Sequence, residues 1–374
     1  MDYYDAIIVG AGPAGSTLAR ALEGSGKKVL IIDKARFPRD KTCAGWVTPA
    51  VLESLNIDIG DYSCGRTLQP IRRFRIGMMG QSPVENDHRN IVSYGLRRCE
   101  FDAYLLDRVT SAKQLGAPVK SIIRENGNWM INDRWQAPLL IGAGGHFCPV
   151  ARLIGARPGK HETIVAAKEV EFKMTPDQAK TCAALGDTPE LWFCRDLKGY
   201  AWVFRKGNFL NIGLGREDNH LLTEHLETFV SEMTKTGRIP SDLPHRFKGH
   251  AYLLYNHADR SLVDDGVLLI GDAAGLAYTQ SGEGIRPAIE SALLAARVIL
   301  NAPDYSALSL QSYGEQITER FGRRPTGQEH GFELPEWLKQ PIASTLMRSH
   351  WFTRKVVIEK WFLHQQVPPL DVAV

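Results

Sequence analysis

The chain has 374 residues, 44% of them hydrophobic, which suits a globular protein of about two to three domains with a full core. Its 45 basic and 42 acidic residues give a formal charge of +3, so no excess of charge points to nucleic acid as a partner. The six cysteines form no C-x-x-C pair of the kind found in metal and redox sites. No basic region precedes the first apolar run, as it would in a secretory signal, and no run of 18 apolar residues is present that could span a bilayer. We therefore expect a cytoplasmic protein with reduced thiols and no metal site.

The first apolar run, Ala6 to Val9, leads straight into a glycine-rich turn. A turn of the form G-x-G-x-x-G after a strand lets the backbone bend tightly, approach a pyrophosphate and pack the following helix closely. The free N–H groups and the dipole of that helix favour an anion without any basic side chain. We predict a dinucleotide at this turn, held by Gly10, Gly12, Pro13, Ala14 and Gly15.

The next apolar run, Val29 to Ile32, ends in Asp33, which lies 18 residues beyond Gly15. A carboxylate at this distance accepts hydrogen bonds from an unphosphorylated adenosine ribose. We place the adjacent Lys34 in the same cofactor site. The pattern fits both FAD and NAD and does not distinguish between them.

A long polar connection, residues 34–46, follows this strand. Long ordered loops are usually functional, and the small residues Ala44 and Gly45 would let the backbone approach a flat ligand. Cys43 places a thiol beside that ligand, although a small packing cysteine explains this residue equally well.

Strand-like stretches at Arg73 to Met78 and Asn90 to Leu96 interrupt the dinucleotide domain and predict an inserted sheet. Arg98 stands at the start of the next helix, where it can reach a cofactor phosphate or ribityl oxygen, or lie on the surface. A further strand is predicted to begin at Ala117 to Lys120, ahead of a hairpin turn at Asn126 to Asn128.

The strand Pro138 to Gly142 ends in another glycine-rich segment. His146 and Cys148 follow it, but they lack a second pair of ligands, so we reject a metal site there. Between residues 160 and 255, alternating apolar residues predict an antiparallel sheet with a helix from about His220 to Thr234 packed on it. The predicted strands are Thr163 to Phe172, Leu191 to Cys194, Ala201 to Phe204 and Phe209 to Leu214.

The chain returns to the first domain through a buried strand that ends in Gly271-Asp272. The segment Ser281-Gly282-Glu283-Gly284-Ile285 then begins a helix with an apolar stripe. The positive end of that helix would favour the charge of a reduced flavin, and Asp272 would accept a hydrogen bond from a ribityl hydroxyl.

The segment from Glu333 onward combines tryptophan and phenylalanine with lysine and arginine, a composition also found at membrane surfaces. From Trp351 to Leu363, however, apolar residues surround the whole helix, which favours a buried helix pair covering the active site. Peripheral membrane contact stays open as the alternative.

Four motifs occur together within residues 1 to about 300: Gly10-x-Gly-x-x-Gly, Arg98-x-x-Phe101-Asp102, Gly271-Asp272-Ala-Ala and Gly282-Glu-Gly-Ile. Two more are Lys41-Thr-Cys43-Ala-Gly45 and Gly199-Tyr200-Ala-Trp202-Val-Phe204. The set resembles the FAD-dependent geranylgeranyl reductase family, within the p-hydroxybenzoate hydroxylase-like flavoprotein monooxygenase superfamily. The last two motifs are similar to the Cys-x-Gly-Gly and Tyr-x-Trp-x-Phe-Pro signatures of that family.

The resemblance implies that FAD occupies the turn at Gly10. It places Asp33 at the ribose, Arg98 and Asp272 at the ribityl and phosphate region, and Val119 by the adenine. Cys43, Ala44 and Gly45 would flank the ring system. The remaining implied cofactor contacts are Gly142, Gly271, Gly282, Gly284 and Ile285.

Three residues depart from the patterns of the family. Arg205 stands where the pocket motif has proline, Trp46 replaces the second glycine of the cysteine motif, and Gly144 replaces an aspartate. A bulky ring at Trp46 and a charge at Arg205 would reshape a tunnel that elsewhere accepts a polyprenyl chain.

These features predict a mixed α/β fold, with a Rossmann-like FAD-binding domain, an inserted antiparallel-sheet substrate domain and a C-terminal helical segment. The FAD-binding domain would comprise residues 1–72, 97–159 and 256–303. The substrate domain would comprise residues 73–96 and 160–255, and the helical cap residues 304–374.

The resemblance implies an oxidoreductase that reduces carbon–carbon double bonds of an apolar isoprenoid-type substrate by hydride transfer from reduced flavin N5. Trp46, Trp202, Phe204 and Arg205 would bind the substrate, while Cys43, Tyr200 or an ordered water would supply a proton. The alternative is a monooxygenase that hydroxylates an aromatic substrate through a C4a-hydroperoxide. A flavin halogenase and a pure electron carrier fit less well.

One strand–glycine–helix fingerprint is present, and we find no second one to hold a nicotinamide cofactor. The electron donor would therefore be NAD(P)H that docks transiently, or a ferredoxin-like protein that approaches a basic surface.

Overall fold

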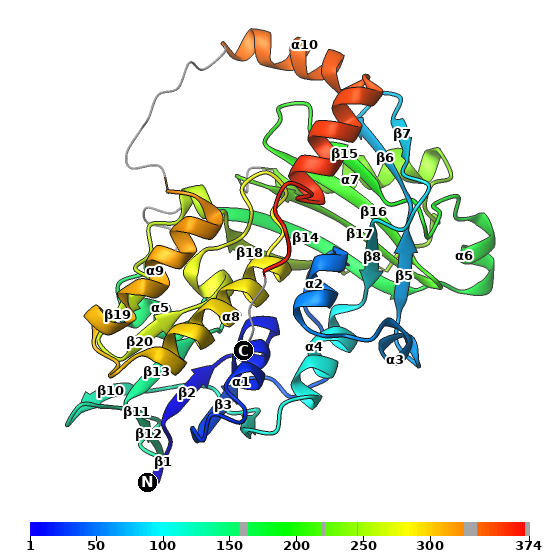
Figure 1. Ribbon diagram of the computed structural model, residues 1–374. Helices are drawn as coiled ribbons and strands as arrows, with labels where there is room; N and C mark the ends of the chain where they lie inside the picture. The colour runs from blue at the N-terminus through cyan, green and yellow to red at the C-terminus, as the bar shows by residue number, and fades with distance from the viewer. Residues whose placement is uncertain (157–163, 219–220, 245, 325–334, 371–374) are drawn as a thin grey trace.

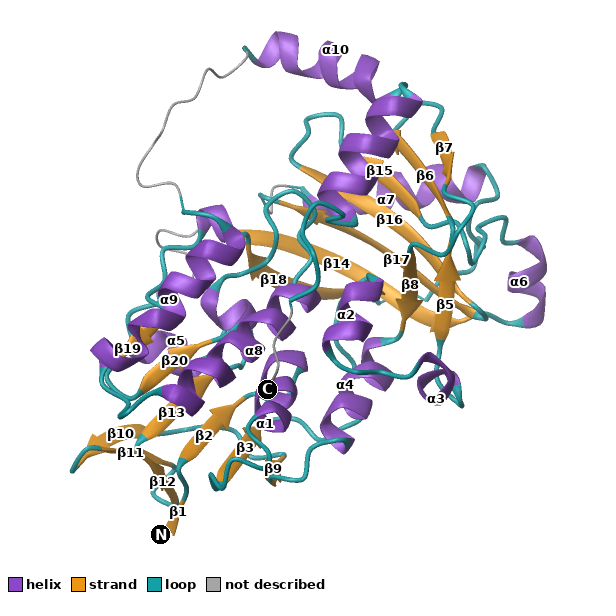
Figure 2. Ribbon diagram, in the orientation of Figure 1, coloured by secondary structure: helices purple, strands orange, loops and turns teal. Residues whose placement is uncertain are grey.

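Two large β-sheets organise the chain, as Figure 1 and Figure 2 show. The computed structural model describes residues 1–156, 164–218, 221–244, 246–324 and 335–370. The predicted segment starts at Thr163 and His220, and the predicted domain boundary at residues 159 and 160, lie outside these ranges.

The first large sheet has six strands, and only its edge strand β19 runs antiparallel to its neighbour. Its central strands are buried along their whole length, because helices α1 (Pro13–Ala21) and α8 (Ile285–Asn301) pack together on one face. In sheet order the strands are β19 (Val263–Asp264), β20 (Val267–Leu269), β13 (Leu139–Gly142), β2 (Ala6–Val9), β3 (Val29–Asp33) and β9 (Ala112–Leu115).

A four-stranded sheet lies against this first sheet near the N-terminus (Figure 1). The predicted hairpin is confirmed: β10 and β11 pair antiparallel across Asn126 and Gly127, which both have positive φ. The strand predicted to begin at residues 117–120 begins slightly later, at Ile122, because the amides of Lys120 and Ser121 donate to the side chain of Asn132. The strands are β1 (Asp2–Tyr3), β12 (Trp135–Ala137), β11 (Asn128–Ile131) and β10 (Ile122–Glu125).

The second large sheet has seven strands and is mixed, since β15 and β6 pair in parallel while the other neighbours are antiparallel. Helix α7 (Leu222–Lys235) packs on one of its faces. In sheet order the strands are β18 (Lys248–Leu253), β14 (Ile164–Lys173), β17 (Phe209–Arg216), β16 (Gly199–Lys206), β15 (Glu190–Phe193), β6 (Arg73–Met78) and β7 (Val84–Asp87).

A small three-stranded sheet lies beside the seven-stranded sheet (Figure 1) and consists of β4 (Trp46–Val47), β8 (Ser93–Leu96) and β5 (Leu68–Ile71). Residues 90–96 are predicted to belong to the inserted sheet, but β8 pairs with β4 and β5 instead. This pairing brings the end of the long loop at residues 34–46 against the second large sheet. The nearby helices are α2 (Pro49–Ser54), α3 (Ile59–Ser63) and α4 (Arg98–Asp107).

The C-terminal segment divides between the two halves of the molecule (Figure 1). Helix α9 (Ala307–Phe321) packs on α8, whereas α10 (Glu336–Met347) and the π-helix η3 (Phe352–Phe362) pack on strands β6 and β7. No helix in the described part of the chain has the length and apolar composition that crossing a bilayer requires. The remaining helices are α5 (Pro149–Leu153), α6 (Pro176–Thr181), η1 (Tyr255–His257) and η2 (Gly271–Ala274).

Candidate active site

A cavity of about 400 Å³ lies where loops of the six-stranded sheet meet the seven-stranded sheet and the end of η3. Most residues predicted for a cofactor and a substrate line this one cavity. They are Gly10, Gly12, Pro13, Ala14, Asp33, Lys34, Cys43, Ala44, Gly45, Trp46, Arg98, Tyr200, Trp202, Asp272, Gly282, Gly284 and Ile285.

The glycine turn forms a cradle that leaves no room for side chains. Gly10 has φ of +117°, and a Cβ added there would lie 2.3 Å from the carbonyl oxygen of Ala143. A Cβ added at Gly15 would lie 1.8 Å from the carbonyl oxygen of Gly10. The backbone therefore passes close to the start of α1, whose free N–H groups favour the phosphates of a dinucleotide.

Asp33 holds the turn in place from the end of β3. Its two carboxylate oxygens accept hydrogen bonds from the amides of Ala11 at 2.7 Å and Ala35 at 2.8 Å. Each carboxylate oxygen has a second lone pair, so the side chain can also accept bonds from ribose hydroxyls. This arrangement fits an adenosine dinucleotide in the cavity.

The second half of the cradle comes from the segment between β20 and α8. Gly284 approaches Asp272 so closely that an added Cβ would lie 2.8 Å from the Asp272 carboxylate. Gly271 has φ of +59° and allows α1 and α8 to approach, since its added Cβ would lie 3.1 Å from that of Ala14. Segments far apart in the chain therefore line one cavity.

Arg98 lines the cavity but is already paired. Its guanidinium donates two hydrogen bonds to Asp102, at 2.8 and 2.9 Å, and Arg39 contacts the same carboxylate at 3.1 Å. Burial opposes the charge of Arg98, but Asp102 and the neighbouring thiol of Cys43 hold its pKa above the ordinary value. Arg98 thus remains a cation beside Cys43.

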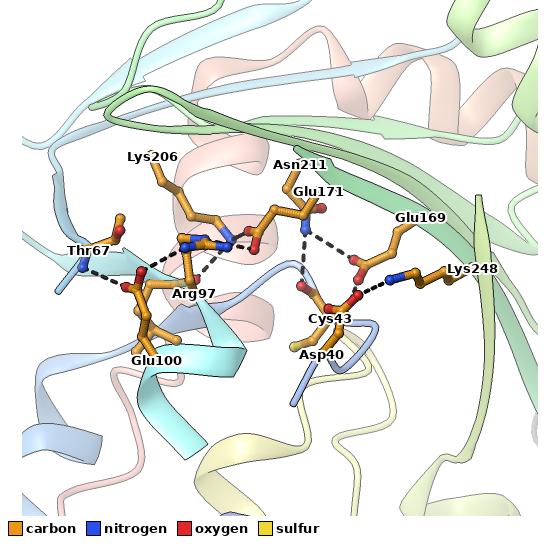
Figure 3. A network of polar contacts seen from close by, with 11 residues as sticks. Asp40, Cys43, Thr67, Arg97, Glu100, Glu169, Glu171, Lys206, Asn211 and Lys248 are labelled. Atoms are coloured by element: carbon orange, nitrogen blue, oxygen red, sulfur yellow. Dashed lines mark hydrogen bonds and ion pairs between the residues drawn. The ribbon is translucent and has the colours of Figure 1, made fainter. Parts of the chain in front are cut away.

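Polar contacts with the seven-stranded sheet fix the loop that carries Cys43, as Figure 3 shows. The amide of Cys43 donates to Glu169 at 2.6 Å, and the side chain of Asn211 donates to the carbonyl of Cys43 at 3.2 Å. Trp202 Nε1 in turn donates to Asn211 Oδ1 at 2.7 Å. Burial raises the pKa of Glu169 to about 7, against the effect of the Cys43 amide and Lys206.

Aromatic rings form another part of the cavity wall. The ring of Trp46 stacks on Phe362 at a centroid distance of 5.3 Å and lies 5.7 Å from Phe204. Tyr200 and Trp202 continue this wall along β16. The hydroxyl of Tyr200 donates to the carbonyl of Ser281 at 2.5 Å, so it links the sheet to the start of α8.

Arg205 does not reach the cavity, which corrects its prediction as a substrate-binding residue. Alternate residues of a strand point to opposite faces, so Arg205 lies on the face away from Trp202. Its guanidinium donates to the carbonyls of Cys182 and Ala184, at 3.4 and 3.3 Å. The charge expected in a substrate tunnel therefore contacts the segment that follows α6.

Five other predicted residues are absent from the cavity lining within the described ranges: Gly15, Val119, Gly142, Gly271 and Phe204. Gly142 serves packing, because an added Cβ would lie 2.5 Å from Leu269. Val119 packs against the core of the six-stranded sheet. Phe204 lies behind Trp46 in the aromatic wall.

Several residues that line the cavity were not predicted from the sequence, among them Glu283, His250, Tyr252 and Phe362. His250 and Tyr252 stand two residues apart on β18, so their side chains point to the same face of the sheet. This spacing could have identified them in the sequence. Lys41 Nζ lies 2.6 Å from His250 Nε2, and burial lowers the pKa of Lys41 to about 8 and of His250 to about 2. Glu283 belongs to the motif Gly282-Glu-Gly-Ile, in which only Gly282, Gly284 and Ile285 are predicted to contact the cofactor.

Comparisons with known proteins identify a cofactor-binding region and relatives that are named as reductases. Residues 3–58 match a family model described as an FAD binding domain. The chain is 27% identical over 346 residues to "Digeranylgeranylglycerophospholipid reductase 3" of Methanosphaera stadtmanae, covering 86% of this chain and 84% of that relative. It is 29% identical over 352 residues to "Menaquinone reductase" of Mycobacterium tuberculosis, covering 86% and 81%.

Solved structures share the fold. A geranylgeranyl bacteriochlorophyll reductase-like protein from Thermoplasma acidophilum superimposes with a TM-score of 0.75 at 24% identity, covering 100% of this chain and 94% of that one. The halogenase PltM, solved with FAD, superimposes with a TM-score of 0.66 at 17% identity, covering 92% and 76%. These likenesses confirm the mixed α/β fold. The match of residues 3–58 to an FAD binding domain supports FAD as the cofactor.

Proposed function

We propose that the chain is an FAD-dependent oxidoreductase of the geranylgeranyl reductase type, which reduces carbon–carbon double bonds of an isoprenoid lipid bound in this cavity. The observation that carries the proposal is that the aromatic residues Trp46, Tyr200 and Trp202 line the same cavity as the dinucleotide cradle. An apolar chain fits such a wall, because burying it there removes both surfaces from water.

The residues of the cradle would hold FAD, which supplies the two electrons of the reduction when it is bound. The turn from Gly10 to Ala14 would contact the diphosphate, Asp33 and Lys34 the ribose, and Asp272 the ribityl chain. Ala44, Gly45 and Gly282 to Ile285 would surround the ring system. Cys43 would lie beside it, fixed by Glu169 and Asn211.

The names of the relatives support an isoprenoid over an aromatic substrate. Digeranylgeranylglycerophospholipids carry isoprenoid chains, and menaquinone carries an isoprenoid tail. The halogenase likeness, at 17% identity, concerns the fold alone. We also propose NAD(P)H or a ferredoxin-like protein as the electron donor.

Mass spectrometry of small molecules carried by the purified protein tests the substrate class. We expect a lipid with an unsaturated or partly reduced prenyl chain. Recovery of a phenolic compound and no prenyl lipid would favour the aromatic hydroxylase instead.

Replacing Trp46 by alanine should weaken substrate binding more than it affects the cofactor. A large ring buries roughly 150–250 Å². Its loss should raise the KM for a prenyl lipid at least ~10-fold, with FAD content unchanged. Arg205→Ala is the matched control, because its side chain lies on the other face of β16, and its KM should stay within about twofold of wild type. Equal KM changes in both variants would contradict the placement of the substrate along this wall.

We propose that α10 and the start of η3 contact a membrane surface, from which an isoprenoid lipid would be taken. Ile342, Leu346 and Trp351 are 40%, 38% and 67% exposed there, and Arg348 is exposed beside them. Exposed apolar side chains next to cations are typical of helices that bind anionic lipid surfaces.

Trp351→Ser should therefore reduce binding to vesicles that contain anionic lipid, by about 10-fold in a sedimentation assay. Leu308→Ser is the control, because Leu308 is 81% exposed on α9, outside this surface. Equal binding of the wild type and Trp351→Ser would contradict the membrane proposal.

A further inference from the structure

Glu283 is a buried carboxyl group that lines the cavity and that the cradle does not explain. It lies between Gly282 and Gly284 at the start of α8. Neither carboxyl oxygen has a hydrogen-bond partner in the described part of the chain, although both are buried. A buried carboxyl group in such a place is usually satisfied or functional.

The C-terminal segment places an imidazole beside this carboxyl group. Nε2 of His364 lies 3.7 Å from Oε2 of Glu283 and 3.4 Å from the hydroxyl of Ser281. The ring of His364 stacks on Tyr278 at a centroid distance of 3.7 Å. Arg286 donates to the carbonyl of Val367 at 2.8 Å and thereby fixes this segment against α8.

Burial keeps both groups uncharged near neutral pH. It raises the pKa of Glu283 to about 8, with Glu290 acting in the same direction and Arg286 against it. It lowers the pKa of His364 to about 4, and Arg286 adds to this effect. The other titratable groups near Glu283 are Tyr278 and Tyr200, whose pKa values are raised mainly by burial. At pH 7 the proton therefore lies on Glu283.

Two other candidate acids in the cavity, Tyr200 and Lys41, already contact other groups. The hydroxyl of Tyr200 donates its proton to the carbonyl of Ser281 at 2.5 Å. The ammonium group of Lys41 lies against His250 at 2.6 Å. Glu283 differs from both, since its proton has no acceptor within hydrogen-bonding distance among the described residues.

We propose that Glu283 donates the proton that completes reduction of the double bond, and that His364 is a positioning residue that holds and reprotonates it. The inference rests on the proposed function. Reduction of one double bond breaks a π bond and forms two C–H bonds. One hydrogen arrives with both electrons from the reduced flavin, which is thereby oxidised. The other arrives as a proton from Glu283, leaving a carboxylate that solvent reprotonates through His364.

The test compares wild type with Glu283→Gln, which keeps the shape of the side chain and removes the proton. Glu53→Gln, on the exposed face of α2, is the matched control. Glu283→Asp, which keeps an acid, checks for rescue. His364→Asn suits the φ of 48° at that position, because asparagine tolerates this backbone region. FAD content and reduction by dithionite should be the same in all five proteins.

Reoxidation of the reduced proteins by a geranylgeranyl lipid without oxygen should then separate them. We expect the reoxidation rate of Glu283→Gln to be at least ~100-fold lower than that of wild type. The rate of Glu283→Asp should lie between the two. The wild-type rate should fall above about pH 8, where Glu283 loses its proton, whereas the residual rate of Glu283→Gln should not. His364→Asn should shift the midpoint of that fall.

Infrared spectroscopy gives a readout that does not depend on turnover. The oxidised, FAD-loaded wild type should have a protonated-carboxyl band that titrates near pH 8, persists in Glu53→Gln and is missing from Glu283→Gln. Equal rates in wild type and Glu283→Gln, or no such band at pH 7, would overturn Glu283 as the donor. A wild type that no prenyl lipid reoxidises would overturn the proposed function, and the donor role with it.

Discussion

Gly10→Ala should produce a folded protein that has lost most of its affinity for FAD. A Cβ at this position would lie 2.3 Å from the carbonyl oxygen of Ala143, so the turn has to open and move away from the diphosphate. We expect FAD binding at least ~100-fold weaker, which corresponds to ~3 kcal/mol. Flavin absorbance of the purified protein and titration of the apoprotein with FAD measure the effect.

Gly24→Ala is the control for Gly10→Ala, because it introduces backbone strain without a steric clash. Gly24 also has positive φ, +78°, but a Cβ there would meet nothing within 4 Å. We expect this control to lose only ~1–2 kcal/mol of stability and to bind FAD normally. If both variants retained FAD equally, the close approach at Gly10 would have no role in binding.

Glu169→Leu should lower both the stability of the fold and the rate of lipid reduction. The amide of Cys43 and the side chain of Asn211 would both lose a buried acceptor. Each unsatisfied group costs about 1–3 kcal/mol, and the loop beside the flavin ring would lose its attachment to β14. We expect a fall in the free energy of unfolding by urea and a slower reduction of the prenyl lipid.

The pH dependence of stability tests the same residue without removing its shape. The pKa of Glu169 is raised from 4.5 to about 7, so between these pH values the folded protein holds a proton that the unfolded chain has released. Stability contributed by this group is therefore present below pH 4.5 and lost as pH rises through 7. Relative to Glu169→Gln, wild type should lose up to ~3 kcal/mol between pH 4.5 and pH 8. If the free energies of unfolding of wild type and Glu169→Gln differed by the same amount at every pH, the raised pKa of Glu169 would be contradicted.

The cofactor half of the site could be predicted from the sequence because it depends on local geometry. A strand, three glycines and a helix in sequence fix a turn, and Asp33 follows at the end of the adjacent parallel strand. The same holds for Gly282 to Ile285 at the start of α8. Here neighbouring residues in the chain are neighbours in the site.

The substrate half could be predicted only in part, because it depends on strand faces and long-range pairing. The motif containing Tyr200 and Trp202 was found, but the register of β16 turns Arg205 to the opposite face. Pairing of β8 with β4, and the return of Phe362 and His364 to the cavity, join residues more than 40 positions apart. Neither periodicity nor spacing reports such contacts.

Mixing the anaerobically reduced protein with a geranylgeranyl lipid tests the central claim most directly. We predict that flavin absorbance returns without oxygen and that the lipid gains the mass of one H2 for each flavin oxidised. Flavin that stays reduced until oxygen is admitted, followed by hydroxylation of an aromatic compound, would contradict the account.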